Sequence, residues 1–145
     1  MTNYIGLDAH STTSTFVVID EKCQETKRTQ IPTSEKRIID FLQSIKGEKN
    51  LVFEESGMSV WLHTILHDVV SKLVVCNPVY VAKKQGAKND YRDALHLAHE
   101  LRKGHLVSVF HDKDNLYIPL RTLTSTYLDV NNDIVAAKNR LKAIF

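Results

Sequence analysis

Four acidic residues stand where a metal-dependent active site could form. Asp8 and Glu54 each follow a short apolar stretch, and Asp90 and Asp93 lie three residues apart at the start of a predicted helix. Carboxylate oxygens are the ligands that Mg²⁺ and Mn²⁺ prefer in proteins. Two such ions can hold the attacking and the leaving oxygen of a phosphodiester on opposite sides of the phosphorus. The four acids therefore predict metal-dependent polynucleotide chemistry, on condition that the fold brings them together.

Mutual repulsion is the reason for expecting cations among these acids. Carboxylates within ~4 Å of one another repel by roughly 1 to 4 kcal/mol per pair, depending on the local dielectric. A cluster of four is therefore favourable only with positive charge between its members. Each aspartate taken alone has an ordinary explanation as a helix cap or a solvated residue, so the prediction depends on the whole set.

The choice between Glu54 and Glu55 stays open at this level. Adjacent residues of a strand point to opposite faces of a sheet, so only one of the two can face the site. Asp20 and Asp68 also follow apolar segments, but neither has a partner placed to share an ion. We expect these two aspartates at the surface.

The elements that position the acids begin with three predicted antiparallel strands. Apolar and β-branched residues at 4–7 and 15–19 flank a polar stretch, which indicates a hairpin. Residues 22–31 are more polar and end at Pro32, as in a third, less buried strand.

The middle of the chain alternates between helical and strand-like patterns. We predict helices at 35–45, 60–69 and 90–102 and strands at 51–53 and 73–75. Alternation after a meander favours an α/β fold, a mixed sheet flanked by helices. This topology resembles the RNase H fold, in which the four acids can converge.

The last part of the chain repeats apolar residues at spacings of three and four. They are Leu116, Leu120, Leu123, Tyr127, Val130, Ile134, Ala137 and Leu141. We predict one long helix, or two helices broken near Pro119. Such a pattern without an equally long partner suggests a coiled-coil arm that forms a dimer or higher homo-oligomer; the alternative is a helix packed on its own sheet. The prediction is a catalytic domain over 1–111 and a helical coiled-coil arm over 112–145.

Composition limits the other possibilities. The chain has 145 residues, 43% hydrophobic and 25% charged, which is ordinary for one folded domain. Its net charge of +2 creates no overall attraction for a polyanion, so nucleic-acid binding must rely on local groups. The candidate phosphate contacts are Lys88, Arg92, Lys138, Arg140 and Lys142. The alternative for all five is an ordinary solvated helix face.

The cysteines and the absence of long apolar runs point to a reduced, cytoplasmic protein. Cys23 and Cys76 lie far apart in predicted strand contexts, without a Cys-x-x-Cys spacing and without a secretory leader before them. No apolar run approaches the ~20 residues that a membrane helix needs. We therefore expect no membrane role.

Histidines and hydroxyls add weaker signals. His63 and His67 are four residues apart on a predicted helix, but they lack a third ligand, so we expect no zinc. His96 follows Asp93 by three residues and could contact a metal ligand or a phosphate, although solvent exposure is the favoured interpretation. Residues 11–14 resemble the phosphate loop of sugar kinases and actin-like ATPases. His10 stands in place of the required glycine there, and the chain is too short for two lobes.

An ordered set of motifs carries a resemblance that spans nearly the whole chain. The motifs are Tyr-Ile-Gly-Leu-Asp8-Ala-His, Glu54-Glu-Ser-Gly57 with Trp61-Leu62, Asn77-Pro78, Lys88-Asn-Asp90-Tyr-Arg-Asp93-Ala94 and Lys138-Asn-Arg-Leu-Lys142. Together they resemble the N-terminal domain of transposases of the insertion-sequence family that includes the pilin-gene invertase. The resemblance implies a RuvC-like site in which Asp8, Glu54, Asp90 and Asp93 bind Mg²⁺ or Mn²⁺. It favours Glu54 over Glu55, and it places Asn89 where relatives often have Thr.

The resemblance also implies a function and partners. Members of this family carry a second, C-terminal domain with a serine nucleophile, joined through a coiled coil, and a structured guide RNA brings target and donor DNA together. We therefore expect the catalytic domain of a DNA transposase or site-specific recombinase, performing metal-dependent strand cleavage and transfer. As a fragment, the chain is expected not to recombine DNA alone. The alternatives are a stand-alone RuvC-type junction endonuclease and a non-catalytic module that binds nucleic acid and dimerises.

Overall fold

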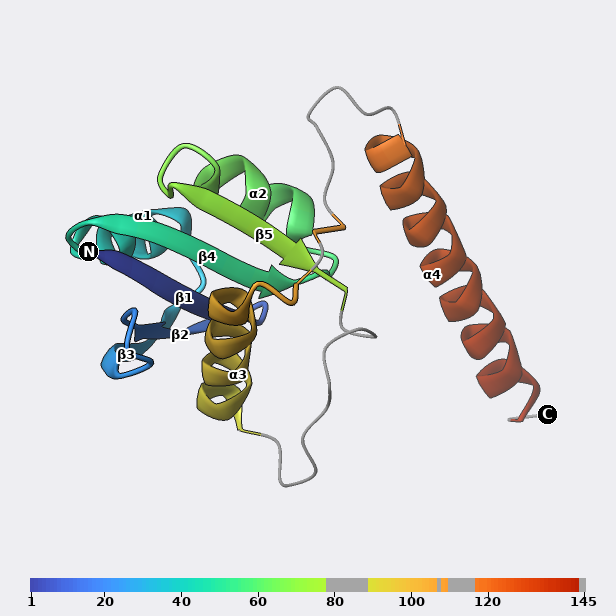
Figure 1. Ribbon diagram of the computed structural model, residues 1–145. Helices are drawn as coiled ribbons and strands as arrows, with labels where there is room; N and C mark the ends of the chain where they lie inside the picture. The colour runs from blue at the N-terminus through green and yellow to red at the C-terminus, as the bar shows by residue number, and fades with distance from the viewer. Residues whose placement is uncertain (78–88, 107, 110–116, 144–145) are drawn as a thin grey trace. The chain divides into compact units, whose positions relative to one another are not determined.

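Five strands and four helices are found among the residues that the structure describes. The computed structural model describes residues 1–77, 89–106, 108–109 and 117–143. The chain divides into two compact units, Met1–Phe110 and His111–Phe145. The first unit holds all the strands and three helices (Figure 1). In chain order its elements are β1 (Thr2–Ala9), β2 (Thr13–Ile19), β3 (Glu25–Pro32), α1 (Glu35–Gln43), β4 (Glu48–Glu54), α2 (Ser59–Leu66), β5 (Lys72–Cys76) and α3 (Asp90–Lys103).

The strands form one mixed sheet in the order β3-β2-β1-β4-β5. β1 lies at its centre, antiparallel to β2 and parallel to β4, so that Leu7 is paired with both Phe16 and Phe53. β2 and β3 are antiparallel, whereas β4 and β5 are parallel. The predicted meander followed by alternating helices and strands is confirmed. At its C-terminal end β1 extends two residues beyond the predicted strand, and β4 extends one residue beyond it. Asp8 and Glu54 are therefore themselves strand residues.

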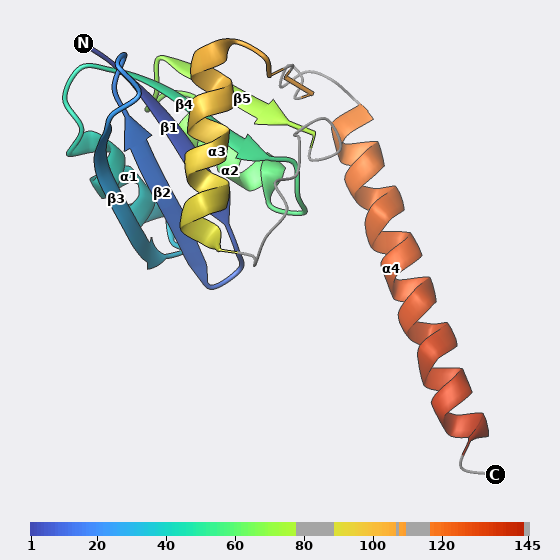
Figure 2. The same cartoon turned by 60° about the horizontal axis from the view of Figure 1, so that its bottom comes forward.

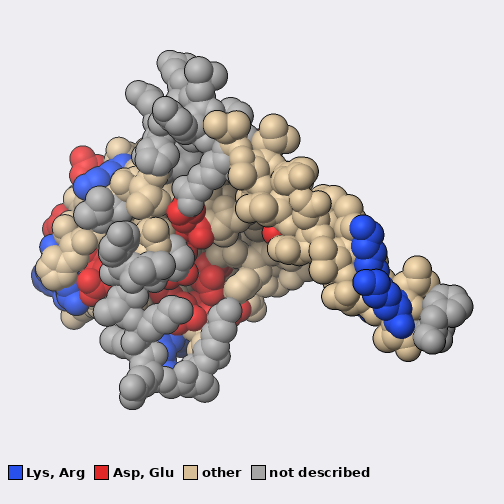
Figure 3. Space-filling view, turned by 90° about the vertical axis from the view of Figure 1, so that its right-hand side faces the viewer, with Lys and Arg blue, Asp and Glu red and all other residues tan. Residues whose placement is uncertain are grey.

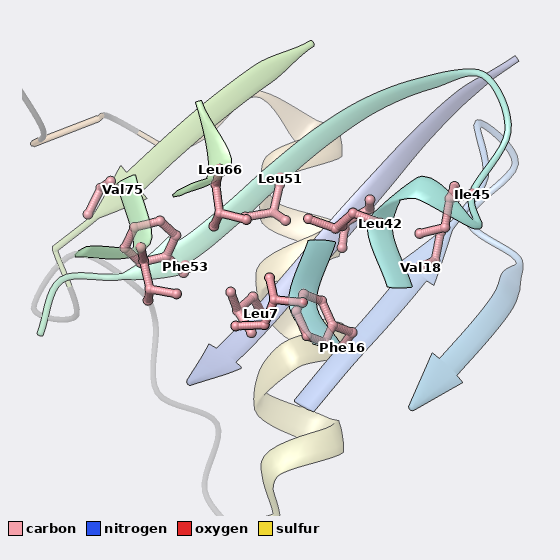
Figure 4. Close-up of a cluster of buried hydrophobic side chains, with 12 residues drawn as sticks. Leu7, Phe16, Val18, Leu42, Ile45, Leu51, Phe53, Leu66 and Val75 are labelled. Atoms are coloured by element: carbon pink, nitrogen blue, oxygen red, sulfur yellow. The ribbon is translucent and has the colours of Figure 1, made fainter. Parts of the chain in front are cut away.

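The larger core lies between the sheet and the helices α1 and α2. Alternate strand residues such as Leu7, Phe16 and Phe53 are fully or almost fully buried there, with Leu42 of α1 and Leu66 of α2 packed on them (Figure 4). Strand residues alternate between the two faces of a sheet, so the neighbours of these residues face the other side. Asp8 and Glu54, which follow Leu7 and Phe53, therefore face the opposite side of the sheet.

Among the described helices, α3 is the one that covers that opposite face (Figure 2). Ala94 and Ala98 pack on Val17 and Ile19 of β2, while Leu97 packs beside Val52 of β4. The small alanines allow the helix to approach the sheet closely. At Gly6 the approach has no room for a side chain: a Cβ atom there would lie 1.8 Å from the carbonyl oxygen of Ala94. Contact between backbone and backbone thus sets the height of α3 above β1.

The turn between β2 and β3 corrects one expectation. Cys23 is exposed and lies in this turn with a positive φ of 63°, not in a strand. The cause is the Asp20 side chain, which accepts hydrogen bonds from the backbone N–H groups of Lys22 and Gln24 and so closes the chain into a tight turn. Cys76 lies in β5 as expected and is buried.

The second unit contains one helix, α4 (Tyr117–Lys142). Of the two predicted arrangements, the single helix is the one observed. Pro119 falls in the first turn, where backbone N–H groups have no intrahelical partner and proline is tolerated. The large apolar side chains described on α4 are exposed. None of the helices among the described residues has the length and apolar character needed to cross a bilayer.

Candidate metal centre

Asp8 and Asp90 meet on the α3 face of the sheet, although 81 residues separate them in sequence. The Nε2 atom of His10 lies 3.3 Å from Oδ2 of Asp8 and 3.7 Å from Oδ1 of Asp90. One ligand atom from each of these three residues lies within 4.8 Å of the others. All three side chains are partly exposed, although the Oδ2 atom of Asp8 that faces His10 is itself buried. The structure thus brings two of the four predicted acids together.

Strand geometry places Asp8 on this face. Leu7 points into the core under α1 and α2, so the next residue must point toward α3. Asp8 is paired with Thr15 of β2, one position beyond the pair of Leu7 with Phe53 of β4. Because neighbouring strands flank β1 on both sides, the backbone that carries the carboxylate is held by the sheet.

Helix capping places Asp90. The Asn89 side chain accepts a hydrogen bond from the backbone N–H of Tyr91, and so caps α3 one residue before Asp90. A threonine at this position could cap the helix in the same way. Gln30 of β3 adds a second support, since its Nε2 donates to Oδ2 of Asp90 at 3.3 Å and to Thr15 Oγ1 at 3.1 Å.

Glu54 ends β4 on the same face. Val52, two positions earlier, packs against α3, and alternation carries Glu54 to that side and Glu55 to the other. The thiol of Cys76, also buried on the α3 face, provides independent evidence. Burial, with a smaller contribution from the nearby negative charge of Glu54, raises the pKa of the Cys76 thiol to about 12. Of the two adjacent glutamates, Glu54 is therefore the one on the same face of the sheet as Asp8, and Glu55 is on the other face.

Asp93 lies one turn further along α3 than Asp90, on the same side of the helix. Among the described residues, the group whose ligand atoms lie close together is Asp8, His10 and Asp90, and it includes neither Asp93 nor Glu54. Glu54 ends the strand next to β1, and Asp93 lies on the helix that carries Asp90. The four acids therefore occupy one end of the sheet and the start of the helix above it.

His10 is the site residue that sequence reasoning missed. The sequence pattern marks it only as the residue that stands in place of a phosphate-loop glycine. The available signal was its spacing: two residues after Asp8, it continues on the same side of an extended strand. Gln30 had no local signal, because its contact with Asp90 depends on how β3 pairs with β2.

His96 departs from its expected exposure. It lies on α3, and its Nε2 atom is buried without a hydrogen-bond partner among the described residues. The neighbouring carboxylate one turn later is Glu100, which is paired with Lys103 at 2.7 Å. His96 as a whole is half-buried, so only part of its ring departs from the expectation.

The basic candidates are spread over both units. Lys88 lies outside the described residues. Arg92 is exposed on α3, two residues after Asp90. Lys138, Arg140 and Lys142 are exposed on α4, and Figure 3 shows basic side chains gathered near the C-terminal end of that helix.

The donor set fits a small divalent cation. Figure 3 shows Asp and Glu side chains gathered on the side of the first unit toward which β1, β4 and β5 point in Figure 1. Oxygens on opposite sides of one Mg²⁺ ion are about 4.2 Å apart, given bond lengths near 2.1 Å. The separation of up to 4.8 Å between Asp8, His10 and Asp90 atoms therefore needs only small side-chain rotations to close around an ion.

Comparisons with known proteins agree on fold and family. A model of the IS110-type DEDD transposases, described as a transposase, matches residues 5–145. The fold is similar to that of T. thermophilus RuvC, solved in complex with a Holliday junction substrate, with a TM-score of 0.56 and 13% identity. The alignment covers 75% of this chain and 100% of the RuvC chain. The predicted RNase H-like fold of the RuvC type is therefore confirmed. No significant match was found among curated protein sequences.

Proposed function

Because this chain belongs to the IS110 family of DEDD transposases, we propose that its first unit is a metal-dependent catalytic domain for DNA strand cleavage and transfer. The observation that carries the proposal is the convergence of Asp8 and Asp90, from a strand and a helix far apart in sequence, within reach of one ion. Two carboxylates placed together at partial exposure repel each other unless a cation lies between them.

Asp8, Glu54, Asp90 and Asp93 are the proposed ligands for Mg²⁺ or Mn²⁺. When bound there, such ions activate the attacking oxygen and stabilise the leaving oxygen of a phosphodiester. The surrounding residues of the chain hold these ligands in position. The sheet holds Asp8 and Glu54, the Asn89 cap and the Gly6 contact hold α3, and Gln30 orients the Asp90 carboxylate.

Contact with DNA is proposed at the same end of the sheet. Arg92 is exposed two residues from Asp90 and is a candidate for a phosphate contact. Lys88 is a further candidate by sequence position. The RuvC structure of the same fold was solved with a branched DNA substrate, which supports nucleic acid as the polymer bound here. We further propose that a guide RNA selects the DNA sites and that complete recombination also requires a serine-bearing domain.

A four-way DNA junction tests this function. We expect Mg²⁺ to strengthen binding of the junction to the chain by ~10-fold, about 1.4 kcal/mol, because the ions remove the repulsion between the acids and the phosphates. Asp90→Asn should remove this dependence on Mg²⁺, as measured by fluorescence anisotropy with labelled junction and duplex.

Two outcomes of the same experiment would contradict the proposal. Cleavage of the junction by this chain alone would identify a stand-alone junction endonuclease. Binding that is independent of both Mg²⁺ and Asp90 would identify a non-catalytic module that holds nucleic acid through basic residues. Gel analysis of the strands after incubation distinguishes the first outcome, and the titration distinguishes the second.

Helix α4 is proposed to join two copies of the chain as a parallel coiled coil. Its apolar residues follow an unbroken heptad pattern: Leu120, Leu123, Tyr127, Val130, Ile134, Ala137 and Leu141. The large members of this seam are exposed in the single chain, at 45% to 69%. Asp133 and Lys138, five residues apart, flank the seam where opposite charges on two parallel helices meet.

Ile134→Glu is expected to dissociate this dimer. Each dimer would lose two buried isoleucines, which weakens association by about 3 kcal/mol, or ~100-fold, before the cost of burying the glutamates is added. Sedimentation velocity of the purified chain measures the change. Asn132→Glu introduces the same charge on the opposite side of the helix and should leave the dimer intact. A wild-type chain that sediments as a monomer at all accessible concentrations would refute the proposal.

A further inference from the structure

His10 lies where it can contribute a nitrogen ligand to the proposed metal centre. Its Nε2 atom is the group that approaches both carboxylates, at 3.3 Å from Asp8 and 3.7 Å from Asp90. The three side chains together offer one nitrogen and two oxygens to a single point. The four-acid site described above uses oxygen ligands alone, so His10 would change the chemical character of the centre.

The backbone presents His10 from a fixed turn. Its N–H donates to the carbonyl of Thr13 at 2.8 Å, and its own carbonyl accepts from the Thr33 hydroxyl at 2.7 Å. That hydroxyl lies 2.8 Å from the hydroxyl of Ser14, which is fully buried. Hydrogen bonds therefore hold the backbone on both sides of the imidazole, and these bonds do not involve the side chain. The β1–β2 turn therefore fixes the backbone from which the ring projects.

Ligand chemistry determines what a nitrogen does at this place. Mg²⁺ prefers oxygen ligands and gives up its water reluctantly. Imidazole suits later divalent ions, and affinity at a mixed site rises from Mn²⁺ to Co²⁺. An imidazole added to two carboxylates therefore gains more binding free energy for Mn²⁺ and Co²⁺ than for Mg²⁺.

We infer that His10 is a ligand of the metal centre and that it shifts the preference of this centre from Mg²⁺ toward Mn²⁺ and Co²⁺. The inference rests on the proposed function, because it assumes that Asp8 and Asp90 bind a divalent ion. In this arrangement the four acids hold the ion, and His10 determines which ion is preferred.

Two measurements on the whole chain test the inference. Pulsed electron paramagnetic resonance of bound Mn²⁺ should show coupling to a nitrogen nucleus in the wild type and none in His10→Ala. Calorimetric titration with Mn²⁺ and with Mg²⁺ should show that His10→Ala reduces the ratio of the two affinities by ~10-fold, chiefly through weaker Mn²⁺ binding. The backbone hydrogen bonds of residue 10 persist in the variant, and thermal unfolding verifies that it folds.

His63→Ala is the matched control. His63 lies on α2, on the opposite face of the sheet from the acids, so its loss should change neither the nitrogen coupling nor the affinity ratio. The alternative role for His10 is to neutralise the two carboxylates until an ion displaces it. In that case the wild type would show no nitrogen coupling, and His10→Ala would bind both ions more tightly, which overturns the inference.

The outcomes separate the inference from the proposed function. If the wild type binds neither Mn²⁺ nor Mg²⁺, the proposed metal centre fails, and the role of His10 fails with it. If both ions bind and depend on Asp90, but the affinity ratio and the nitrogen signal do not depend on His10, only the inference fails. The nitrogen coupling can be measured on the wild type alone, so this part of the test does not depend on the folding of a variant.

Discussion

Asp8→Asn is expected to weaken Mn²⁺ binding by ~100-fold or more, because even the loss of an outer partner of a metal ligand costs 10- to 100-fold. The asparagine keeps the shape of the side chain but removes the charge that attracts the ion. Asp8 lies in the central strand, next to Asp90 and His10, so no other described acid can take its position. Calorimetric titration of the wild type and the variant measures the difference.

Thermal unfolding gives a second measurement of the same prediction. Mn²⁺ at 100 times its dissociation constant should stabilise the wild type by about 2.7 kcal/mol, which raises the Tm by roughly 10 °C for a domain of this size. Asp8→Asn should lose that increase. Without metal, its Tm should stay within about 2 °C of the wild type, because a partly exposed isosteric change has a small effect on folding.

The two adjacent glutamates provide the control. Glu54→Gln should also weaken Mn²⁺ binding, whereas Glu55→Gln should not, because alternation along β4 directs Glu55 away from Asp8. The two substitutions make the same chemical change at neighbouring positions. Equal effects of both, or an Asp8→Asn variant that binds Mn²⁺ as tightly as the wild type, would contradict the assignment of the acids.

The contrast between Asp8 and His10 shows what sequence could predict here. Asp8 was identifiable because an acid at the end of an apolar strand is unusual and because the motifs around it resemble those of a known family. The elements were predictable for a similar reason, since apolar periodicity is a local property. His10 carries an equally local signal, its spacing from Asp8, but that spacing does not indicate the second contact of His10, which is with Asp90.

Features that depend on long-range contact were not predictable. Gln30 touches Asp90 because β3 pairs with β2 in one register, and no pattern near residue 30 indicates this. The orientation of Glu54 required knowledge of which strand residues pack under α3. Each of these properties depends on how strands and helices pack against one another, so it cannot be predicted from the sequence of one strand or helix.

Gly6 connects the stability of the fold with the geometry of the metal centre. The helix that carries Asp90 and Asp93 lies directly on β1, which carries Asp8, and Gly6 is the point of contact. A Cβ atom at residue 6 would lie 1.8 Å from the Ala94 carbonyl oxygen and 2.9 Å from the Ala98 nitrogen. Both are backbone atoms of α3, so no side-chain rotation or truncation can relieve the clash. The helix itself would have to move away from the strand.

Gly6→Ala is therefore expected to destabilise the chain by about 3 kcal/mol or more, the upper range for overpacking, and to lower its Tm by roughly 10 °C. Because any folded variant must hold α3 further from β1, Mn²⁺ affinity should fall even at temperatures where the protein stays folded. Gly57→Ala is the matched control, since a Cβ atom at residue 57 would have no heavy atom within 4 Å. Thermal unfolding and metal titration of both variants provide the measurements. A Gly6→Ala variant as stable as the Gly57→Ala variant would show that α3 does not rest on β1, and the convergence of Asp8 with Asp90 would lose its structural basis.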